Sequence, residues 1–449
     1  MIGIMKTTMI GHAGLLIETS NKIIVCDPWL SKTGAFLCSW HQWPRNDNLG
    51  DEIMNKIMKA DYLYVSHLHR DHFDEEFLTG YFKTNPDVTV LLPKFSEPNI
   101  LKRELSKLGC TKFIEMVDKE PIDMGGFTIH GVIDWNGTYA NKGDSTLCVT
   151  DESGTIVNQN DSKIDWYPES VDIHFTQFSG AIWYPMAYRS SMNDEDKYHD
   201  IIKSEIERRA STFINTITES KALHVFPHAG PPVFLRESQQ WLNAVGESVF
   251  YDQPELLSYV RSHDVNNVHP VMPGMVLELN NHELTIAYPE GMTAQDVEDY
   301  YALDNKAKEL EKYAMERKSI IEAFDNSLPQ PTVDLGQKLQ EWLTPVLEAK
   351  AELLDKIGSN IMVESDDKEV QILFDWQARK VRTLNSTDVY DHSFTIPRRI
   401  LELMLIQKQR VWTSEIFLGA VHTSWRRDAY NRYVYDLLAQ MAVPPLPKQ

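Results

Sequence analysis

Six consecutive residues of this sequence contain four side chains that can bind metal ions, in the order His67-Leu-His69-Arg-Asp71-His72. An apolar stretch at residues 62–65 predicts a buried strand just before them. Because a strand end lies at the rim of a sheet, we expect His67 and His69 to face one metal ion, and Asp71 and His72 a second. Imidazole and carboxylate groups suit zinc, iron or manganese. The alternative, a polar loop with surface histidines, does not explain so dense a group of ligands.

The elements that position this motif are expected to alternate between strands and helices. A hairpin opens the pattern, with a turn at Ser20-Asn21-Lys22. Strands are then predicted at residues 62–65, 88–92, 113–117, 127–133, 146–150, 155–158, 173–178, 223–226 and 283–287, and helices at 51–60, 98–108, 195–220 and 293–324. Strands and helices interleaved in this order predict an α/β layered sandwich.

A polar segment that contains prolines, Asn326-Ser-Leu-Pro-Gln-Pro331, is typical of a break between domains. We therefore expect a catalytic domain at residues 1–325 and a smaller domain at 332–449. The smaller domain is predicted to be α+β, with a helix at 335–357, a strand pair near 371–374 and 381–384, and helices from 397 onward. Its sequence contains no cluster of metal-ligand residues.

The composition argues against several classes of protein and of partner. The 44 basic and 65 acidic side chains give a net charge of −21, which repels nucleic acid and anionic lipid surfaces. The four cysteines are scattered along the sequence, so we expect reduced thiols and no Rieske iron–sulfur cluster built from them. No apolar stretch is long enough to cross a membrane, and no signal peptide is evident. We expect a cytoplasmic protein with a small molecule as its substrate.

The metal motif resembles the His-x-His-x-Asp-His signature of the metallo-β-lactamase superfamily, whose fold is an αββα sandwich. The resemblance implies a bridging aspartate after a later strand, and Asp161 stands at the matching position. It also implies a further histidine at another strand end. His228 fits that position, whereas His224 lies inside the strand and is expected to be a packed side chain.

The sequence departs from the superfamily at the third histidine of the first metal. Asp134 follows the strand that ends at Ile133, and His130 comes three to four residues too early. Asp134 is either a carboxylate ligand that replaces the histidine or an ordinary turn-forming acid. A carboxylate ligand would make the site richer in oxygen, which favours iron over zinc.

Three further features admit two interpretations each, and a fourth admits one. Asp74 could hydrogen-bond a ligand histidine or could be an exposed acid that starts a helix. His12 could line the pocket, although a core histidine with satisfied hydrogen bonds is the preferred interpretation. The Trp183-Tyr184 pair could form a wall of the substrate pocket or belong to the core. The Arg208-Arg209 pair is predicted to lie on a solvated helix face.

Several phrases beyond the motif resemble the CMP-N-acetylneuraminic acid hydroxylases and their bacterial relatives. The phrases are Cys26-Asp-Pro-Trp-Leu30, Gln177-Phe-Ser-Gly-Ala-Ile-Trp-Tyr-Pro185, Phe226-Pro-His-Ala-Gly-Pro-Pro232, Pro273-Gly274, Phe394-Thr-Ile-Pro-Arg-Arg399, Ser424-Trp-Arg-Arg427 and Tyr430-Asn-Arg-Tyr433. They spread over most of the chain. The resemblance implies oxygen-dependent hydroxylation at an iron site, although His228 stands where that branch is expected to have a non-ligating residue. Those hydroxylases carry an N-terminal Rieske domain, and this sequence starts with the hairpin, so we expect electrons from an external ferredoxin or reductase, or from the substrate.

Three hypotheses about function remain after the sequence has been considered. The leading one is a di-iron oxygenase, with metal ligands His67, His69, Asp134, Asp71, His72 and His228 and with Asp161 as the bridge. The second is a hydrolase in which a bridging hydroxide attacks an ester, lactone, amide or phosphodiester. The third is a non-enzymatic protein in which the metal only stabilises the fold, and it is disfavoured because a loop-borne cluster at a sheet rim should leave coordination positions open.

Overall fold

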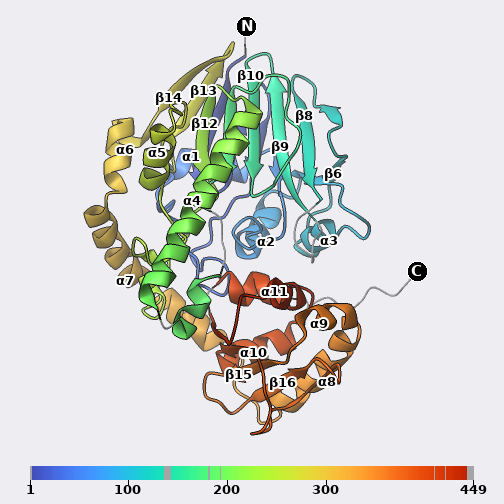
Figure 1. Cartoon of the computed structure of the whole chain (residues 1–449). Coiled ribbons are helices and arrows are strands. Elements are labelled where there is room, and N and C mark those ends of the chain that lie inside the picture. The colour runs from blue at the N-terminus through green and yellow to red at the C-terminus, as the bar shows by residue number, and fades with distance from the viewer. Residues whose placement is uncertain are drawn as a thin grey trace.

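A computed structural model describes residues 3–135, 143–179, 183–192, 194–408, 410–419 and 421–441. Residues 180–182, which belong to the phrase from Gln177 to Pro185, lie outside these ranges. Two stacked sheets form the larger part of the molecule, and a smaller third sheet with its helices lies at the other end (Figure 1). The helices of the described residues include none that is long and apolar enough to cross a membrane.

The first sheet contains the strand that leads into the metal motif. It has eight strands in the order β14 (Glu283–Ala287), β13 (Val276–Asn280), β1 (Met5–Gly11), β2 (Gly14–Glu18), β3 (Ile23–Cys26), β4 (Tyr62–Tyr64), β5 (Thr89–Pro93) and β6 (Phe113–Met116). Strands β3 to β6 run parallel to one another, so their carboxyl ends meet at one edge of the sheet. The metal motif follows β4 at that edge.

The second sheet brings later parts of the chain to the same edge. Its six strands are ordered β12 (His224–His228), β11 (Ile173–Gln177), β10 (Gly154–Asn160), β9 (Asp144–Asp151), β8 (Thr128–Asp134) and β7 (Pro121–Asp123). An apolar core fills the space between the two sheets, with members such as Leu15 and Tyr64 from the first and Ile156 and Phe226 from the second. Burial of these side chains is the main favourable term that holds the two sheets together.

Helices cover the outer face of each sheet. Apolar side chains of α1 (Gly50–Met58), α2 (Glu75–Thr84) and α3 (Ile100–Lys107) pack against the first sheet. Those of α4 (Glu195–Ser220) and α5 (Gln253–Ser262) pack against the second. The predicted αββα sandwich is therefore confirmed.

The third sheet belongs to the C-terminal part of the chain. Its strands are ordered β17 (Lys380–Thr383), β16 (Gln371–Asp375), β15 (Ile361–Ser365), β18 (His392–Ile396) and β19 (Thr423–Arg426), and its helices are α8 (Leu335–Glu348), α9 (Ala351–Ile357), α10 (Arg398–Ile406) and α11 (Arg432–Ala439). The predicted α+β character of this part is confirmed. Trp183 is buried in its core and stacks on Tyr435 with ring centroids 5.6 Å apart, so the core interpretation of Trp183 is confirmed.

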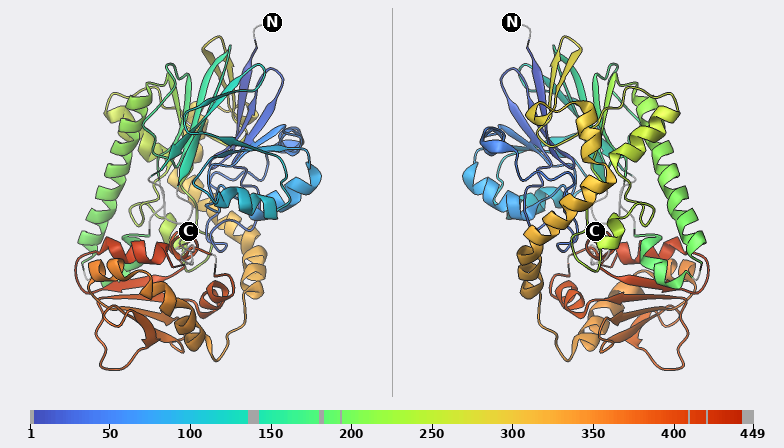
Figure 2. Two further views of the ribbon diagram at one scale, coloured as in Figure 1. Left: turned by 90° about the vertical axis from the view of Figure 1, so that its right-hand side faces the viewer. Right: turned by 90° about the vertical axis from the view of Figure 1, so that its left-hand side faces the viewer.

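Two helices predicted as continuous are each divided in the structure. The stretch 293–324 forms α6 (Ala294–Tyr300) and α7 (Leu303–Ser327), because the backbone turns at Ala302 and both Tyr300 and Tyr301 pack on Trp43. The stretch 335–357 forms α8 and α9, with a non-helical residue at Lys350. Helices α4 and α7 lie on opposite sides of the molecule, and each runs from the sandwich toward the C-terminal part (Figure 2).

Candidate metal site

Two neighbouring parallel strands, β3 and β4, place Asp27 beside the metal motif. Asp27 directly follows β3, and its carboxylate is fully buried. It accepts hydrogen bonds from the backbone N–H of Ser66 at 2.8 Å and from the Ser66 hydroxyl at 2.6 Å. The start of the motif loop is therefore tied to the end of the adjacent strand.

His72 is oriented by the same aspartate. Its Nδ1 lies 3.0 Å from Oδ2 of Asp27. Its Nε2 is buried without a hydrogen-bond partner among the described residues and lies 3.5 Å from Oδ2 of Asp161 and 3.7 Å from Oδ2 of Asp71. Burial opposes protonation, but the carboxylates of Asp161 and Asp71 raise the pKa of His72 well above its usual value. A metal cation would neutralise the negative charge of these carboxylates in place of the proton on His72.

His67 shows the same arrangement with a different aspartate. Its Nδ1 lies 2.9 Å from Oδ1 of Asp144, and its Nε2 lies 3.9 Å from Oδ2 of Asp161. This Nε2 is also buried and unpartnered within the described ranges. The ring of His69 lies 4.5 Å from that of His67, and His69 lines the adjoining cavity. In both His67 and His72, a carboxylate holds one ring nitrogen and the other nitrogen points at Asp161, as in metal-binding histidines.

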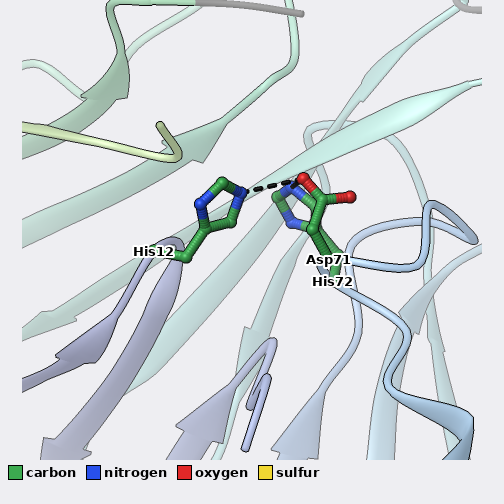
Figure 3. Close-up of side chains that lie close together, drawn as sticks. All are labelled: His12, Asp71 and His72. Carbon is green, nitrogen blue, oxygen red and sulfur yellow. Dashed lines mark hydrogen bonds and ion pairs between the residues drawn. The ribbon is translucent and has the colours of Figure 1, made fainter. Parts of the chain in front are cut away.

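His12 joins the site from the turn between β1 and β2. Its Nε2 lies 2.8 Å from Oδ2 of Asp71, as Figure 3 shows. Ligand atoms of His12, Asp71 and His72 lie within 4.8 Å of one another, and so do those of His67, His72 and Asp161. The two groups share His72. The sequence favoured a core role for His12, and its contact with Asp71 places it instead among the metal-motif side chains.

His228 ends β12 and is buried close to the same cluster. Both of its ring nitrogens lack a hydrogen-bond partner in the part of the chain that the structure describes. Burial, and then the nearby His12 and His72, lower the pKa of His228 well below its usual value, so the ring is neutral. A neutral imidazole with two free nitrogens is a competent metal ligand.

Asp134 and Asp144 face each other across the pair of strands β8 and β9. Oδ2 of Asp134 accepts a hydrogen bond from the backbone N–H of Lys163 at 2.8 Å. Asp144 instead lines the cavity and contacts His67. Sequence reasoning missed Asp144 because it precedes the strand predicted at residues 146–150, whereas in the structure it is the first residue of β9. Only the pairing of β8 with β9 brings it opposite Asp134, the strand end at which an acid was sought.

Asp74 and Arg209 differ from their predicted exposure. Asp74 is the N-cap of α2 and accepts from the backbone N–H of Phe77, so it does start a helix. It is buried, however, because its carboxylate also accepts from the backbone N–H groups of Leu30 and Ser31. The side chain of Arg209 is only 12% exposed, so the prediction of a solvated face is wrong for this residue.

A cavity of about 380 Å³ adjoins the cluster. The residues His69, Asp71, Asp144 and Asp161 line it, together with Arg208 and Arg209 of α4 and Leu418 of the C-terminal part. A cavity of this volume suits a small-molecule ligand.

The C-terminal part holds the motif loop through a partly buried charge pair. Arg70 lies between His69 and Asp71, and its Nε donates to Oε1 of Glu415 at 3.0 Å. Glu415 is buried in a short π-helical turn, Thr413–Phe417, and Arg410 approaches the same oxygen at 3.0 Å. Leu418, which directly follows this turn, lines the cavity. Its carbonyl accepts a hydrogen bond from the indole N–H of Trp40 at 2.7 Å.

The fold and these residues define a metallo-β-lactamase-fold protein with the metal-binding motif of that fold. A family model described as "Beta-lactamase superfamily domain" matches residues 6–158, and one described as "Rv3818-like, SCP2-like domain" matches residues 335–444. A protein of Mycobacterium tuberculosis named "Putative Rieske 2Fe-2S iron-sulfur protein Rv3818" is 31% identical over 448 residues, which span 96% of this chain and 83% of that protein. The chain belongs to the family of this mycobacterial protein, within the metallo-β-lactamase superfamily.

The similarity to the hydroxylases is confirmed over part of the chain. The CMP-N-acetylneuraminic acid hydroxylase of Danio rerio is 30% identical over 112 residues, which are 24% of this chain and 18% of that protein, rather than most of the chain as expected. Among solved structures, the diiron β-hydroxylase CmlA of Streptomyces venezuelae matches with a TM-score of 0.40 and 16% identity, over 62% of this chain and 54% of that one. The metallo hydrolase Igni18 of Ignicoccus hospitalis matches with a TM-score of 0.41 and 13% identity, over 62% and 99% of the two chains.

Proposed function

We propose that this protein is a di-iron enzyme that uses dioxygen to hydroxylate a small polar metabolite. The observation that carries the proposal is the carboxylate of Asp144 beside His67, at the side of the site where the superfamily usually supplies a third histidine. With Asp71 and Asp161, three aspartates then line the cavity next to the histidines. A donor set rich in carboxylate oxygen favours iron over zinc.

The buried atoms of the site fit a pair of metal ions. Each unpartnered atom, Nε2 of His67, Nε2 of His72 and Oδ1 of Asp71, belongs to a side chain whose other polar atom is already held by a neighbour. A buried polar atom without a partner destabilises the folded state by about 1–3 kcal/mol. Metal coordination would remove this cost at all three atoms.

We assign one iron to His67, His69 and a carboxylate, and the other to Asp71, His72 and a histidine. Asp144 is the proposed carboxylate of the first iron, in the role for which Asp134 was the candidate from sequence. Asp161 is the proposed bridge, because its Oδ2 lies between His67 and His72 and its Oδ1 accepts from Gln177 at 2.8 Å. The candidate histidines of the second iron are His12, which contacts Asp71, and His228, whose ring nitrogens are buried without a partner among the described residues.

The iron pair, when bound, would supply the reduction of dioxygen. The protein residues orient the ligands through Asp27 and Asp144 and provide a cavity in which a substrate C–H bond faces His69 and Asp161. The overall reaction is R–H + O₂ + 2 e⁻ + 2 H⁺ → R–OH + H₂O, so an external electron donor is needed. An iron–sulfur protein or a flavin reductase is the proposed donor class, in keeping with the name of the mycobacterial relative.

Metal analysis combined with oxygen reactivity tests this proposal. Protein produced without added metal salts is analysed for its elements and by Mössbauer spectroscopy, reduced with dithionite, and mixed with oxygenated buffer in a stopped-flow spectrometer. We expect two irons per chain and an optical change on mixing. The His69→Ala variant is the control and should show neither. Protein that contains only zinc, and that is inert to oxygen after iron loading and reduction, would contradict the proposal.

The second candidate function is a metal-dependent hydrolase, and His228 is the observation that favours it. Its two free nitrogens allow a second metal site with the histidine that the superfamily normally has there. In that case a metal-bound hydroxide would attack an ester, lactone, amide or phosphodiester. Turnover of a chromogenic ester or phosphodiester by zinc-loaded protein under argon, lost in His69→Ala, would decide for the hydrolase.

A further inference from the structure

One face of α4 lines the cavity opposite the metal cluster. Arg209, Thr212, Phe213 and Thr216 are spaced by three and four residues, so they lie along one stripe of the helix, and all four line the cavity. Apolar residues of the helix, such as Ala210 and Ile217, pack on the second sheet instead. The stripe therefore presents a guanidinium group and two hydroxyl groups to whatever occupies the cavity.

Arg209 is a mostly buried cation whose acidic neighbour, Glu205, is shared with Arg208. Its Nε and one of its terminal nitrogens, Nη2, are fully buried without a hydrogen-bond partner among the described residues. The carboxylate of Glu205 lies 3.8 Å from this terminal nitrogen, and Arg208 holds the same carboxylate oxygen at 2.7 Å. Burying a charge without a hydrogen-bonded partner is unfavourable, so an anionic ligand at this point would stabilise the protein.

Three cationic side chains line the cavity of a strongly acidic protein. Arg208, Arg209 and Lys163 all line the cavity, whereas the chain as a whole has a net charge of −21. The aspartates of the lining, Asp71, Asp144 and Asp161, belong to the metal cluster, where bound cations would offset their charge. Field lines concentrated in a cleft of one sign raise the local concentration of ions of the opposite sign.

We propose that Arg209 anchors an oxyanion of the substrate, a carboxylate or phosphate group, while the remainder of the substrate extends toward His69 and Asp161. This assignment rests on the proposed function, because it names the substrate class of the same cavity. Arg208 and Lys163 assist at the rim. A planar guanidinium group suits an oxyanion because it offers two parallel N–H donors.

The test measures binding of phenylphosphonate and of benzoate to metal-loaded protein by titration calorimetry. We expect Arg209→Gln to weaken binding of at least one probe by about tenfold or more, because the variant loses the charged hydrogen bonds to the oxyanion. Arg209→Lys keeps the charge but not the paired donors, so its affinity for the probe should lie between those of the wild type and of Arg209→Gln. Arg103→Gln on α3, which removes an exposed arginine paired with Glu104, is the matched control and should bind as the wild type does.

A crystal of the wild-type protein soaked in 4-bromophenylphosphonate gives a readout that does not depend on the folding of a variant. A bromine anomalous peak in the cavity, with the phosphonate beside Arg209, supports the proposal. A phosphonate bound at the metal ions alone, absence of binding, or equal affinity of wild type and Arg209→Gln overturns it. The measurement is the same with iron or zinc bound, so a failure of the oxygenase proposal would not be mistaken for a failure of this one.

Discussion

Oδ1 of Asp144 lies 2.9 Å from Nδ1 of His67, and this contact joins the first residue of β9 to the loop that follows β4. The two sheets of the sandwich contribute one partner each. Burial opposes ionisation of Asp144, but the charges of His67 and its hydrogen bond lower the pKa of this carboxyl to about 2. Asp144 is therefore an anion, the state in which it can both hold Nδ1 of His67 and serve as the proposed carboxylate ligand of the first iron.

Replacement of Asp144 by asparagine should weaken iron binding about 10- to 100-fold, the usual effect of losing a carboxylate partner of a ligand histidine. Competition with a chromogenic chelator measures the affinity. Asp134→Asn is the matched control, because Asp134 sits opposite on β8 and accepts from the backbone of Lys163. If Asp134→Asn instead weakens iron binding and Asp144→Asn does not, the assignment of the carboxylate ligand is wrong.

Asp27→Asn should destabilise the metal-free protein by about 2 kcal/mol or more, because a buried acceptor of several hydrogen bonds is lost. The asparagine NH₂ group would take the place of Oδ2 and could no longer accept a hydrogen bond from the Ser66 hydroxyl or from Nδ1 of His72. Urea unfolding followed by circular dichroism measures the change.

Asp87→Asn is the control for this experiment. Asp87 is 88% exposed and pairs with Lys112, so its loss should leave the free energy of unfolding nearly unchanged. Equal destabilisation by both substitutions would show that Asp27 does not hold the loop.

Substitution of His228 or His12 should weaken metal binding at one of the two proposed positions and leave the other occupied. His228→Gln and His12→Gln act on the side of the site formed by Asp71 and His72, so we expect the metal content of one or both variants to fall from about two ions per chain toward one. Elemental analysis after gel filtration measures this content.

His174→Gln is the control, since His174 is equally buried but its ring nitrogens are bound by Ser220 at 2.9 Å and Gln159 at 2.8 Å. Its metal content should match that of the wild type. Unchanged content in both the His228 and the His12 variants would remove these histidines from the ligand set.

The buried Glu415 makes the stability of the protein depend on pH in the acid range. Burial raises the pKa of Glu415, but Arg410 and Arg70 outweigh it and hold this pKa below its ordinary value of 4.5. In the acid range the unfolded chain therefore binds more protons at this residue than the folded chain does. The stabilisation is present above about pH 4.5 and is lost as the pH falls through the folded-state pKa.

Glu415→Gln should remove this contribution, so its unfolding free energy should fall less steeply than that of the wild type below about pH 5. Urea unfolding of metal-free protein at several pH values measures the slope. Glu322→Gln, at an exposed and loose ion pair with Lys318, should leave the slope nearly unchanged. Identical slopes for wild type and Glu415→Gln would contradict the proposed pH dependence.

The sequence alone determined the elements whose residues are close together along the chain. The spacing of His67, His69, Asp71 and His72 is local, so the loop that carries them could be recognised without a structure. Apolar stretches of strand and helix length marked most of the two stacked sheets and the long helix α4 for the same reason. Neighbouring residues fix the backbone pattern, and the pattern of alternating elements permits few folds.

Only the tertiary structure decided which distant residues complete the site. His12, Asp27 and Asp144 each lie on a different strand end, and strand pairing rather than sequence spacing brings them to His67 and His72. The same holds for Arg209. Its position on a charged helix predicted exposure to solvent, but α4 packs beside the cavity and the side chain is largely buried there. Burial and contact are properties of the whole assembled chain, and a local pattern does not contain them.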